Sequence, residues 1–275
     1  MRLLILGGNG MAGHMLVDYF RKSSNYSVFY SVRDRSSIHG LVVDARDSVQ
    51  VEKMIDVVAP DVIINAIGIL NDRAERNELD AFLLNGLFPH QVKRMADKAG
   101  SRFIHISSDC VFSGELGGHR EDDVPDGHTT YARTKVLGEI KAERHLTIRT
   151  SIVGPEIREQ GIGLMDWFLR QQGTVKGYRF AIWNGVTTLE LAKAIHHIIE
   201  SPLSGLLHLT APESISKLEL LLLFQRTFNK EDVKIVPDDA IRLDRTLLHT
   251  RKDFFYEVPR YGRMLSELRE WMRNR

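Results

Sequence analysis

The sequence begins with a short apolar segment, a glycine-rich turn and an amphipathic stretch, and this order strongly limits what the chain can fold into. Residues 2–6 predict a buried strand, and a helical pattern runs from about residue 11 to residue 21. Glycines between them allow a tight turn and bring backbone N–H groups close to a pyrophosphate. The helix N-terminus then faces that anion with its partial positive charge. We predict a dinucleotide site here, against the alternative of a plain turn, formed by Gly7 (or Gly8), Asn9, Gly10, Met11 and Gly13.

The end of the second predicted strand, residues 27–32, bears on which dinucleotide is bound. Proteins that bind NAD place an acidic residue about 20 positions after the glycines, where it meets the adenosine ribose. Here the strand is followed by Arg33, Asp34 and Arg35. Two guanidinium groups suit a 2′-phosphate. The sequence therefore favours NADP, while Asp34 leaves NAD open, and a charged surface turn is the alternative.

Strands and helices then alternate as far as residue 151, which predicts a parallel sheet covered on both faces. Strands are predicted at 42–44, 60–68, 103–107 and 145–149, and helices at 47–58, at 78–99 and around Tyr131. Asn85 is a polar interruption in the apolar stripe of the 78–99 helix, and a loop is expected at 113–129. Residues at the carboxyl ends of parallel strands face the ligand in such folds. Five further cofactor contacts are predicted there: Asp44, Ala45 and, after the next strand, Asn65, Ala66 and Gly68.

After residue 152 the pattern changes, and a smaller lobe is expected over 153–275. Helices are predicted at 164–172, 189–199, 216–228 and 261–272, and strands at 206–210 and 233–236; a polar loop is expected at 183–188. We therefore predict a Rossmann-type, doubly wound α/β domain over 1–152 with a smaller substrate-binding lobe. The division is interleaved, because 187–200 is expected to pack on the main sheet.

Tyr131 and Lys135 lie four residues apart, so on a helix they share one face. An ammonium beside a phenol lowers the cost of the tyrosinate, and a tyrosine tuned in this way can exchange a proton with an alcohol oxygen. The hydroxyl of Ser107 or Ser108, at the end of the preceding strand, could bind the same oxygen. The alternative for this spacing alone is a solvated helix face.

Taken together, these segments resemble the extended short-chain dehydrogenase/reductase family, and within it the dTDP-4-dehydrorhamnose reductase branch of sugar-nucleotide reductases. The resemblance covers roughly the first 155 residues and, more thinly, 184–192. It rests on Gly7, Gly10 and Gly13; residues 61–66; Asn85 with Pro89; residues 105–114 leading to Tyr131, Lys135, Gly138 and Glu139; and residues 149–151.

The resemblance implies a nicotinamide cofactor and a nucleotide-diphosphate-linked 4-keto-6-deoxy sugar. It implies that Tyr131 is the general acid, that Lys135 binds the nicotinamide ribose and lowers the tyrosine pKa, and that Ser108 rather than Ser107 orients the carbonyl. Ser107 is then expected at the cofactor, and Asn85 matches the active-site asparagine. Cys110 departs from the branch, which usually has tyrosine there, and this leaves the sugar open. The predicted substrate contacts are Ser108, Asp109, Val111, Tyr131 and Trp183.

Composition limits the other functions. The net charge is +1 and no stretch reaches the ~18 apolar residues of a membrane helix, so neither nucleic acid nor membrane is expected as a partner. A single cysteine suits the cytoplasm, and no His/Cys/carboxylate spacing suggests a metal. The expected partners are the sugar nucleotide and, in a homodimer, a second copy. An epimerase and a non-catalytic cofactor-binding regulatory subunit stay open as alternatives. A dehydratase does not, because no glutamate follows Asp109.

Overall fold

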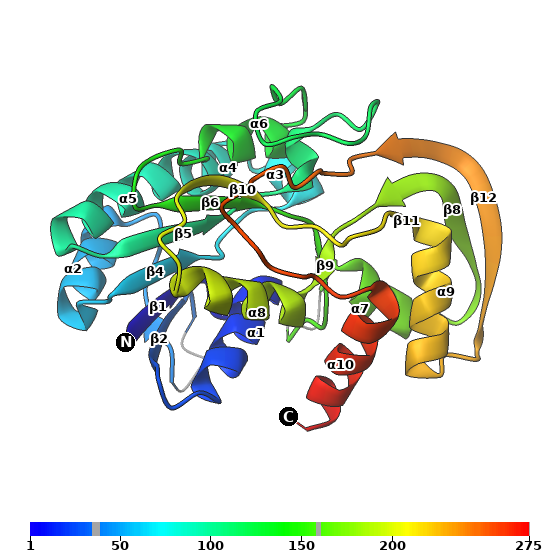
Figure 1. The fold of residues 1–275 in the computed structure, drawn as a ribbon, viewed down its shortest axis with the longest axis horizontal. Coiled ribbons are helices and arrows are strands. Elements are labelled where there is room, and N and C mark those ends of the chain that lie inside the picture. The colour runs from blue at the N-terminus through cyan, green and yellow to red at the C-terminus, as the bar shows by residue number, and fades with distance from the viewer. Residues whose placement is uncertain (35–38, 158–160, 275) are drawn as a thin grey trace.

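The computed structural model describes residues 1–34, 39–157 and 161–274, and its centre is a seven-stranded parallel sheet with the strand order β10-β6-β5-β4-β1-β2-β3 (Figure 1). Strand β1 (Arg2–Leu6) lies between β2 (Ser27–Val32) and β4 (Val62–Asn65). The other strands of this sheet are β3 (Leu41–Val42), β5 (Arg102–Ile106), β6 (Leu146–Arg149) and β10 (Gly205–His208). The predicted Rossmann-type α/β fold is confirmed.

Alternate residues of β1 explain the two helical layers, because successive side chains of a strand point to opposite faces. Leu3 and Ile5 belong to a core cluster with residues of α1 (Met11–Arg21) and α8 (Thr188–Ile199). Leu4 and Leu6 belong to a second cluster, with residues of α2 (Ser48–Val58) and α5 (Phe88–Ala99). Figure 1 shows these helices on opposite sides of the sheet. A continuously apolar strand is therefore buried on both faces.

The helix predicted over 78–99 is not uniform. It consists of α4 (Glu78–Ala81), a π-helical stretch η1 (Phe82–Leu87) and α5, and a short helix, α3 (Asn71–Arg76), precedes it. Asn85 lies in the π-helical stretch and is fully buried. Such π segments occur often at functional sites. The polar interruption seen in the sequence thus marks a change in helical winding.

A smaller lobe is built on a three-stranded sheet, β11-β8-β12, with β11 (Ile215–Ser216), β8 (Gly173–Trp183) and β12 (Val233–Asp244). The sequence predicted only residues 233–236 of β12 and missed β8. Pro237 and the adjacent acidic residues interrupt the strand pattern, but β12 is an edge strand, where proline is tolerated, and its register shifts between Asp238 and Arg242. The other elements after residue 108 are η2 (Asp109–Val111), α6 (Thr130–Leu137), β7 (Ile152–Val153), α7 (Leu164–Arg170), β9 (Val186–Thr187), α9 (Lys217–Phe228) and α10 (Tyr261–Arg273).

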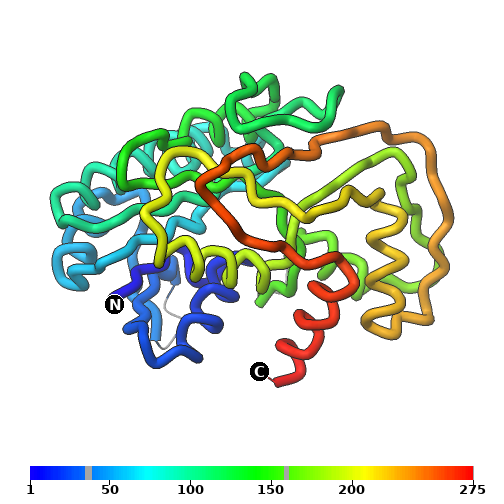
Figure 2. Tube along the Cα trace, in the orientation of Figure 1, coloured from blue at the N-terminus to red at the C-terminus, as the bar shows by residue number. Residues whose placement is uncertain are grey.

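After β12 the chain runs back from the smaller lobe across the end of the large sheet before α10 begins (Figure 2). We call residues 245–254 the return segment. His208 of β10 bonds to the Leu248 carbonyl through Nδ1, and Arg251 contacts the carbonyls of Ser204 and Leu206. Helix α8 and β10 likewise belong to the main sheet's layers. The smaller lobe is thus tied to the large sheet at several points.

No helix among the described residues is long and apolar enough to cross a membrane.

The glycine turn gives a test of the fold. A Cβ atom at position 13 would lie 2.1 Å from the Gly7 carbonyl oxygen, whereas a Cβ at Gly262, in the first turn of α10, meets nothing within 4 Å. Gly13→Ala is therefore expected to destabilise the protein by about 1–3 kcal/mol, because rigid backbone must move. Gly262→Ala is the control and should cause no loss. Urea unfolding measures both, and equal midpoints for Gly13→Ala and wild type would contradict the close approach.

Candidate active site

The predicted catalytic residues meet at the carboxyl edge of β5. Ser107 and Ser108 follow that strand directly, and α6 brings Tyr131 and Lys135 to it. Thr129 begins α6, its hydroxyl accepting a hydrogen bond from the Ala132 N–H at 3.1 Å. The Tyr131 phenol is buried and near enough to Ser108 for that hydroxyl to influence its pKa, while Ser108 Oγ donates to Asp109 Oδ1 at 3.1 Å. A phenol and an aliphatic hydroxyl thus converge on one spot, as the binding of a carbonyl oxygen requires.

The environment of Tyr131 keeps its proton in place. Burial is the largest influence and raises the pKa of Tyr131, and Cys110 and Asp109 raise it further, while the Ser108 hydroxyl lowers it. The phenol is accordingly protonated at neutral pH. It can donate a proton, which is the role of a general acid.

The Lys135 ammonium bonds to strand β5 and makes no hydrogen bond to Tyr131. Its Nζ donates to the Ile106 carbonyl at 2.7 Å and lies 3.5 Å from His105 Nε2, so the long side chain reaches across to β5 instead of along the helix. Lys135 is not among the groups that shift the pKa of Tyr131, and the expected lowering of that pKa is not observed. Burial lowers the pKa of Lys135 to about 8, although Glu139 opposes this shift.

Asn85 joins the segment after β4 to helix α6. Its Oδ1 accepts from the Ile69 N–H at 2.8 Å, and its Nδ2 donates to the Ile69 carbonyl at 2.9 Å and to Thr134 Oγ1 at 3.1 Å. All its bonds to described residues are therefore to neighbours of the site, and none is to Lys135. Asn85 positions α6 through Thr134, the residue before Lys135.

The glycine turn has the form that a pyrophosphate needs. Gly7 has a φ of +85°, and its carbonyl accepts from the Gly10 N–H at 2.9 Å, so the fingerprint begins at Gly7. Gly10 precedes α1 without a capping side chain, and the first turn of α1 carries no acidic residue. Asn9 and Met11 are partly exposed beside it. The N–H groups at the start of α1 are thus left for an anion.

The other predicted cofactor residues differ in exposure and in the hydrogen bonds they already make. Arg33 and Asp34 are exposed after β2, and Arg35 lies outside the described residues. Asp44 is bonded to Arg46, which lowers its pKa, and Ala45 is partly buried. Asn65 is fully buried; it bonds to His105 Nδ1 at 3.1 Å and accepts from the Ile67 N–H at 3.0 Å, so its side chain already has partners. Ala66 is partly buried, and Gly68 lies against Asn85.

Glu139 and Arg149 are functional-site residues to which the sequence assigned no role. Arg149 is fully buried and holds the buried Glu139 carboxylate in two hydrogen bonds, from Nε at 2.7 Å and from Nη2 at 2.8 Å. Ser107 Oγ donates to the same carboxylate at 3.0 Å. Glu139 follows Lys135 in a segment that the resemblance used, and that position was the available signal.

The smaller lobe contributes Arg245 to the site. Its guanidinium donates to the carbonyls of Phe112 and Ser113 and lies 3.5 Å from Cys110 Sγ. Burial, the main cause, raises the pKa of the Cys110 thiol to about 12, which makes it a poor nucleophile. Two predicted substrate contacts are covered: Val111 is fully buried beside Phe112, and Trp183 stacks on Tyr261.

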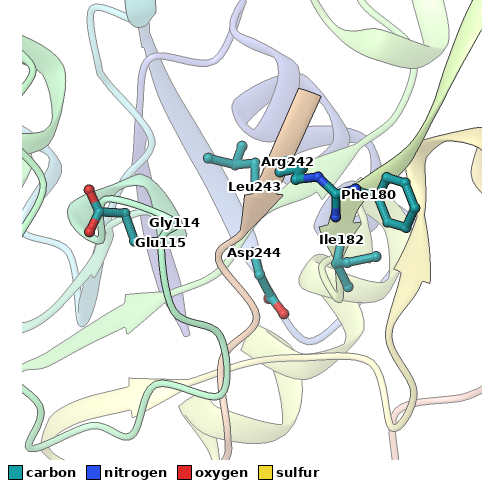
Figure 3. Close-up of a pocket in the computed structure, with 7 residues that line it drawn as sticks. All are labelled: Gly114, Glu115, Phe180, Ile182, Arg242, Leu243 and Asp244. Atoms are coloured by element: carbon teal, nitrogen blue, oxygen red, sulfur yellow. The ribbon is translucent and has the colours of Figure 1, made fainter. Parts of the chain in front are cut away.

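A cavity of about 410 Å³ adjoins this region between the loop at Gly114 and strands β8 and β12 (Figure 3). The Arg242 guanidinium points toward the Phe180 ring and lies 4.1 Å from its centre, and Leu243 points toward Gly114. The rest of its lining is Glu115, Ile182 and Asp244. Among the described residues, no group of three or more His, Cys, Asp or Glu side chains could hold a metal ion.

This fold and this site define an oxidoreductase scaffold of the extended short-chain dehydrogenase/reductase type. The chain belongs to the RmlD substrate binding domain family, whose model matches residues 1–244. The predicted family is confirmed.

Relatives and solved structures agree with this membership. The chain is 26% identical over 218 residues to the spore coat polysaccharide biosynthesis protein SpsK of Bacillus subtilis, covering 76% of this chain and 73% of that protein. It is 31% identical to dTDP-4-dehydrorhamnose reductase of Mycobacterium tuberculosis, but over 50% of this chain and only 44% of that protein. It is also 25% identical to methionine adenosyltransferase 2 subunit beta of Danio rerio, over 86% of this chain and 76% of that protein.

Among solved structures, dTDP-4-dehydrorhamnose reductase of Bacillus anthracis, in complex with NADP, superposes with a TM-score of 0.85. It covers 98% of this chain and 99% of that one at 20% identity. At this identity the likeness establishes the fold.

Glu121 holds the return segment in place, and this contact gives a pH-dependent prediction. We call Glu121 and its bonds to this segment the clamp. The Glu121 carboxylate accepts from Thr250 Oγ1 and the His208 N–H and lies 3.5 Å from His249 Nδ1. Burial alone would raise the pKa of Glu121, but hydrogen bonds from His249 and Thr250 outweigh it and lower that pKa from 4.5 to about 2. The bond to Glu121 in turn raises the pKa of His249. Ionised Glu121 therefore stabilises the fold above its unfolded pKa, and this contribution disappears as the pH falls toward the folded value.

Glu121→Gln is expected to lower the free energy of unfolding by on the order of 1–2 kcal/mol at about pH 5.5, where His249 is also protonated. The difference from wild type should shrink as the pH falls from about 4.5 toward about 2. Urea unfolding at several pH values measures this, with Glu143→Gln at an exposed position as the control. A difference that does not change with pH would contradict the clamp.

Proposed function

We propose that this protein uses NADPH to reduce the 4-keto group of a nucleotide-diphospho-deoxysugar, in deoxysugar or polysaccharide biosynthesis. One observation carries the proposal: a buried, protonated Tyr131 phenol beside the Ser108 hydroxyl at the carboxyl edge of the sheet. The names of the relatives support it, since one is a dTDP-4-dehydrorhamnose reductase and another a polysaccharide biosynthesis protein. The substrate-binding part is proposed to be 153–275, and 1–152 the NAD(P)-binding domain.

The chain's own residues fit the cofactor. A side chain at Gly13 would clash with the Gly7 carbonyl, Gly7 has a positive φ, and the N-terminus of α1 is open to a pyrophosphate. We assign Asn9, Met11 and the residues after β4 to the same cleft, with Arg33 at a 2′-phosphate. NADP is preferred and NAD possible, which agrees with the NADP-bound structure of the Bacillus anthracis protein. When bound, the cofactor supplies the hydride.

The catalytic roles follow from the contacts of each group. Ser108 and Tyr131 bind the carbonyl oxygen, and Tyr131 donates its proton to that oxygen as negative charge develops there. Because burial keeps the phenol protonated, it needs no prior proton uptake. Lys135, held by the Ile106 carbonyl, presents its ammonium to the cofactor ribose, and Asn85 positions α6. Ser107 is held by Glu139 at the cofactor side, and Asp109 adjoins the sugar. The contacts predicted for Val111 and Trp183 stay predictions.

A second candidate is a cofactor-binding subunit without catalysis, which the similarity to methionine adenosyltransferase 2 subunit beta favours. An epimerase would return its hydride to the sugar. Purified protein with NADPH and a panel of nucleotide-linked 4-keto sugars distinguishes the three. A reductase consumes NADPH with at least one sugar, an epimerase converts its substrate without net consumption, and the subunit binds NADPH without turnover. We further propose a cytoplasmic homodimer.

Tyr131→Phe removes the proposed acid. Turnover is expected to fall on the order of 100-fold or more, because proton donation is lost while the ring still fills its site. Tyr26→Phe, where the ring packs between Phe20 and His196 away from the site, is the control. Steady-state NADPH oxidation measures both. Near-normal turnover of every accepted sugar by Tyr131→Phe would contradict the role of Tyr131 as the general acid.

Arg33→Ser tests the cofactor preference. Loss of a guanidinium from the 2′-phosphate should raise the Kd for NADPH about tenfold or more and leave the Kd for NADH nearly unchanged. Titration of the bound nicotinamide fluorescence gives both constants, with the exposed Arg94→Ser on α5 as the control. Equal losses for the two cofactors would place Arg33 away from the 2′ position.

A further inference from the structure

Lys217 brings a positive charge from the smaller lobe to the catalytic edge of the large domain. It is the first residue of α9 and is partly buried. Its Nζ lies 4.6 Å from the centre of the Trp183 ring. Asp109 and Cys110, which follow Ser108, are the acidic groups that act on its charge. The side chain therefore lies at the segment that follows Ser108.

The ammonium of Lys217 is only partly satisfied. Among the described residues it has no hydrogen-bond acceptor, and no carboxylate lies within 4.0 Å, although Asp109 is near enough to influence it. Burial lowers the pKa of Lys217 to about 8. Its contact with Trp183 is a cation–π interaction, which leaves all three N–H donors unpaired. A desolvated cation of this kind gains most from an anionic acceptor.

The other basic groups at the site already have partners of their own. Arg245 donates to two backbone carbonyls, and Lys135 donates to the Ile106 carbonyl. Arg242 lies over the Phe180 ring in the cavity, on the exposed side. Lys217 is thus the described cation that stands between the catalytic hydroxyls and the cavity with its donors free.

The strand register fixes this intermediate position. Ile182 of β8 lines the cavity, and it pairs with Ser216 on one side and with Asp244 on the other. Lys217 follows Ser216, and Arg245, which reaches Cys110, follows Asp244. The two basic residues therefore flank the same point of β8, where the cavity of Figure 3 adjoins the segment after Ser108. Lys217 and Arg245 thus lie between the cavity and the catalytic edge along β8.

We propose that Lys217 binds the diphosphate of the sugar nucleotide, with the sugar on the Tyr131 side and the nucleoside on the side of Arg242 and Phe180. The inference rests on the proposed function and extends it to the substrate's anionic group. The diphosphate is the part of such a substrate that carries negative charge, whereas the deoxysugar offers neutral hydroxyls. Trp183, whose ring contacts the Lys217 ammonium, acts as a positioning residue in this arrangement.

Calorimetry with UDP and dTDP as probes tests the proposal, and uridine and thymidine serve as ligands without phosphate. Lys217→Met is expected to weaken binding of at least one nucleoside diphosphate about tenfold or more, while the Kd for NADPH stays unchanged. Lys217→Arg should restore most of the affinity. Lys234→Met, at an exposed position near the other end of β12, removes the same charge and should have no effect.

A second measurement uses the wild-type protein and does not depend on a variant's folding. Saturating UDP or dTDP should slow the labelling of Lys217 by an amine-reactive reagent, measured by mass spectrometry, whereas the nucleoside should not. Unchanged labelling, unchanged affinity of Lys217→Met, or no diphosphate binding by wild type would overturn the proposal. A raised KM for the sugar nucleotide with unchanged diphosphate affinity would move Lys217 to the sugar and overturn it as well.

These outcomes separate the two proposals. If diphosphates bind through Lys217 but no keto sugar is reduced, the reductase function fails and the anion site stands. If a keto sugar is reduced and Lys217→Met binds diphosphates normally, the anion site fails and the reductase function stands.

Discussion

The buried ion pair of Arg149 with Glu139 is the interaction on which the catalytic edge depends. Taking both charges out of water is costly, and the cost is offset only where geometry and additional hydrogen bonds are good. Here the guanidinium holds the carboxylate through two bonds, Ser107 donates to the same carboxylate, and His208 Nε2 lies 3.4 Å from Arg149 Nη1. The pair thereby joins β5, β6, β10 and the segment after α6. Removing either partner would leave an uncompensated charge beside Ser107 at the end of β5.

Around this pair, burial sets the protonation states that the chemistry needs. Burial raises the pKa of Tyr131 and lowers the pKa of Lys135 to about 8, so the phenol keeps its proton and the lysine is still mostly an ammonium at neutral pH. A protonated phenol suits the reduction of a carbonyl, which ends with a proton on oxygen. The Lys135 ammonium is stabilised by its hydrogen bond to the Ile106 carbonyl and by the nearby Glu139 carboxylate. Burial thus prepares the phenol as an acid.

The smaller lobe and the return segment complete the site from the other side. Glu121 holds Thr250 and the backbone of His208, and Arg245 reaches Phe112 and Ser113. These contacts connect residues distant in the sequence, and together with the apolar core that the lobe shares with the large sheet they fix the lobe's position. Lys217 and the cavity beside Arg242 are products of that arrangement.

The sequence by itself determined the sheet, the glycine turn and the grouping of Ser108, Tyr131 and Lys135, because these follow from local periodicity and from the rule that parallel strands end at one edge. It did not determine where the side chain of Lys135 points, the π-helical winding at Asn85, or strand β8, whose polar and glycine positions hide its pairing with β12. Nor did it assign roles to Glu139, Arg149, Arg245 or Lys217. Those roles depend on contacts between segments far apart in the chain, and only tertiary packing decides which desolvated charge finds which partner.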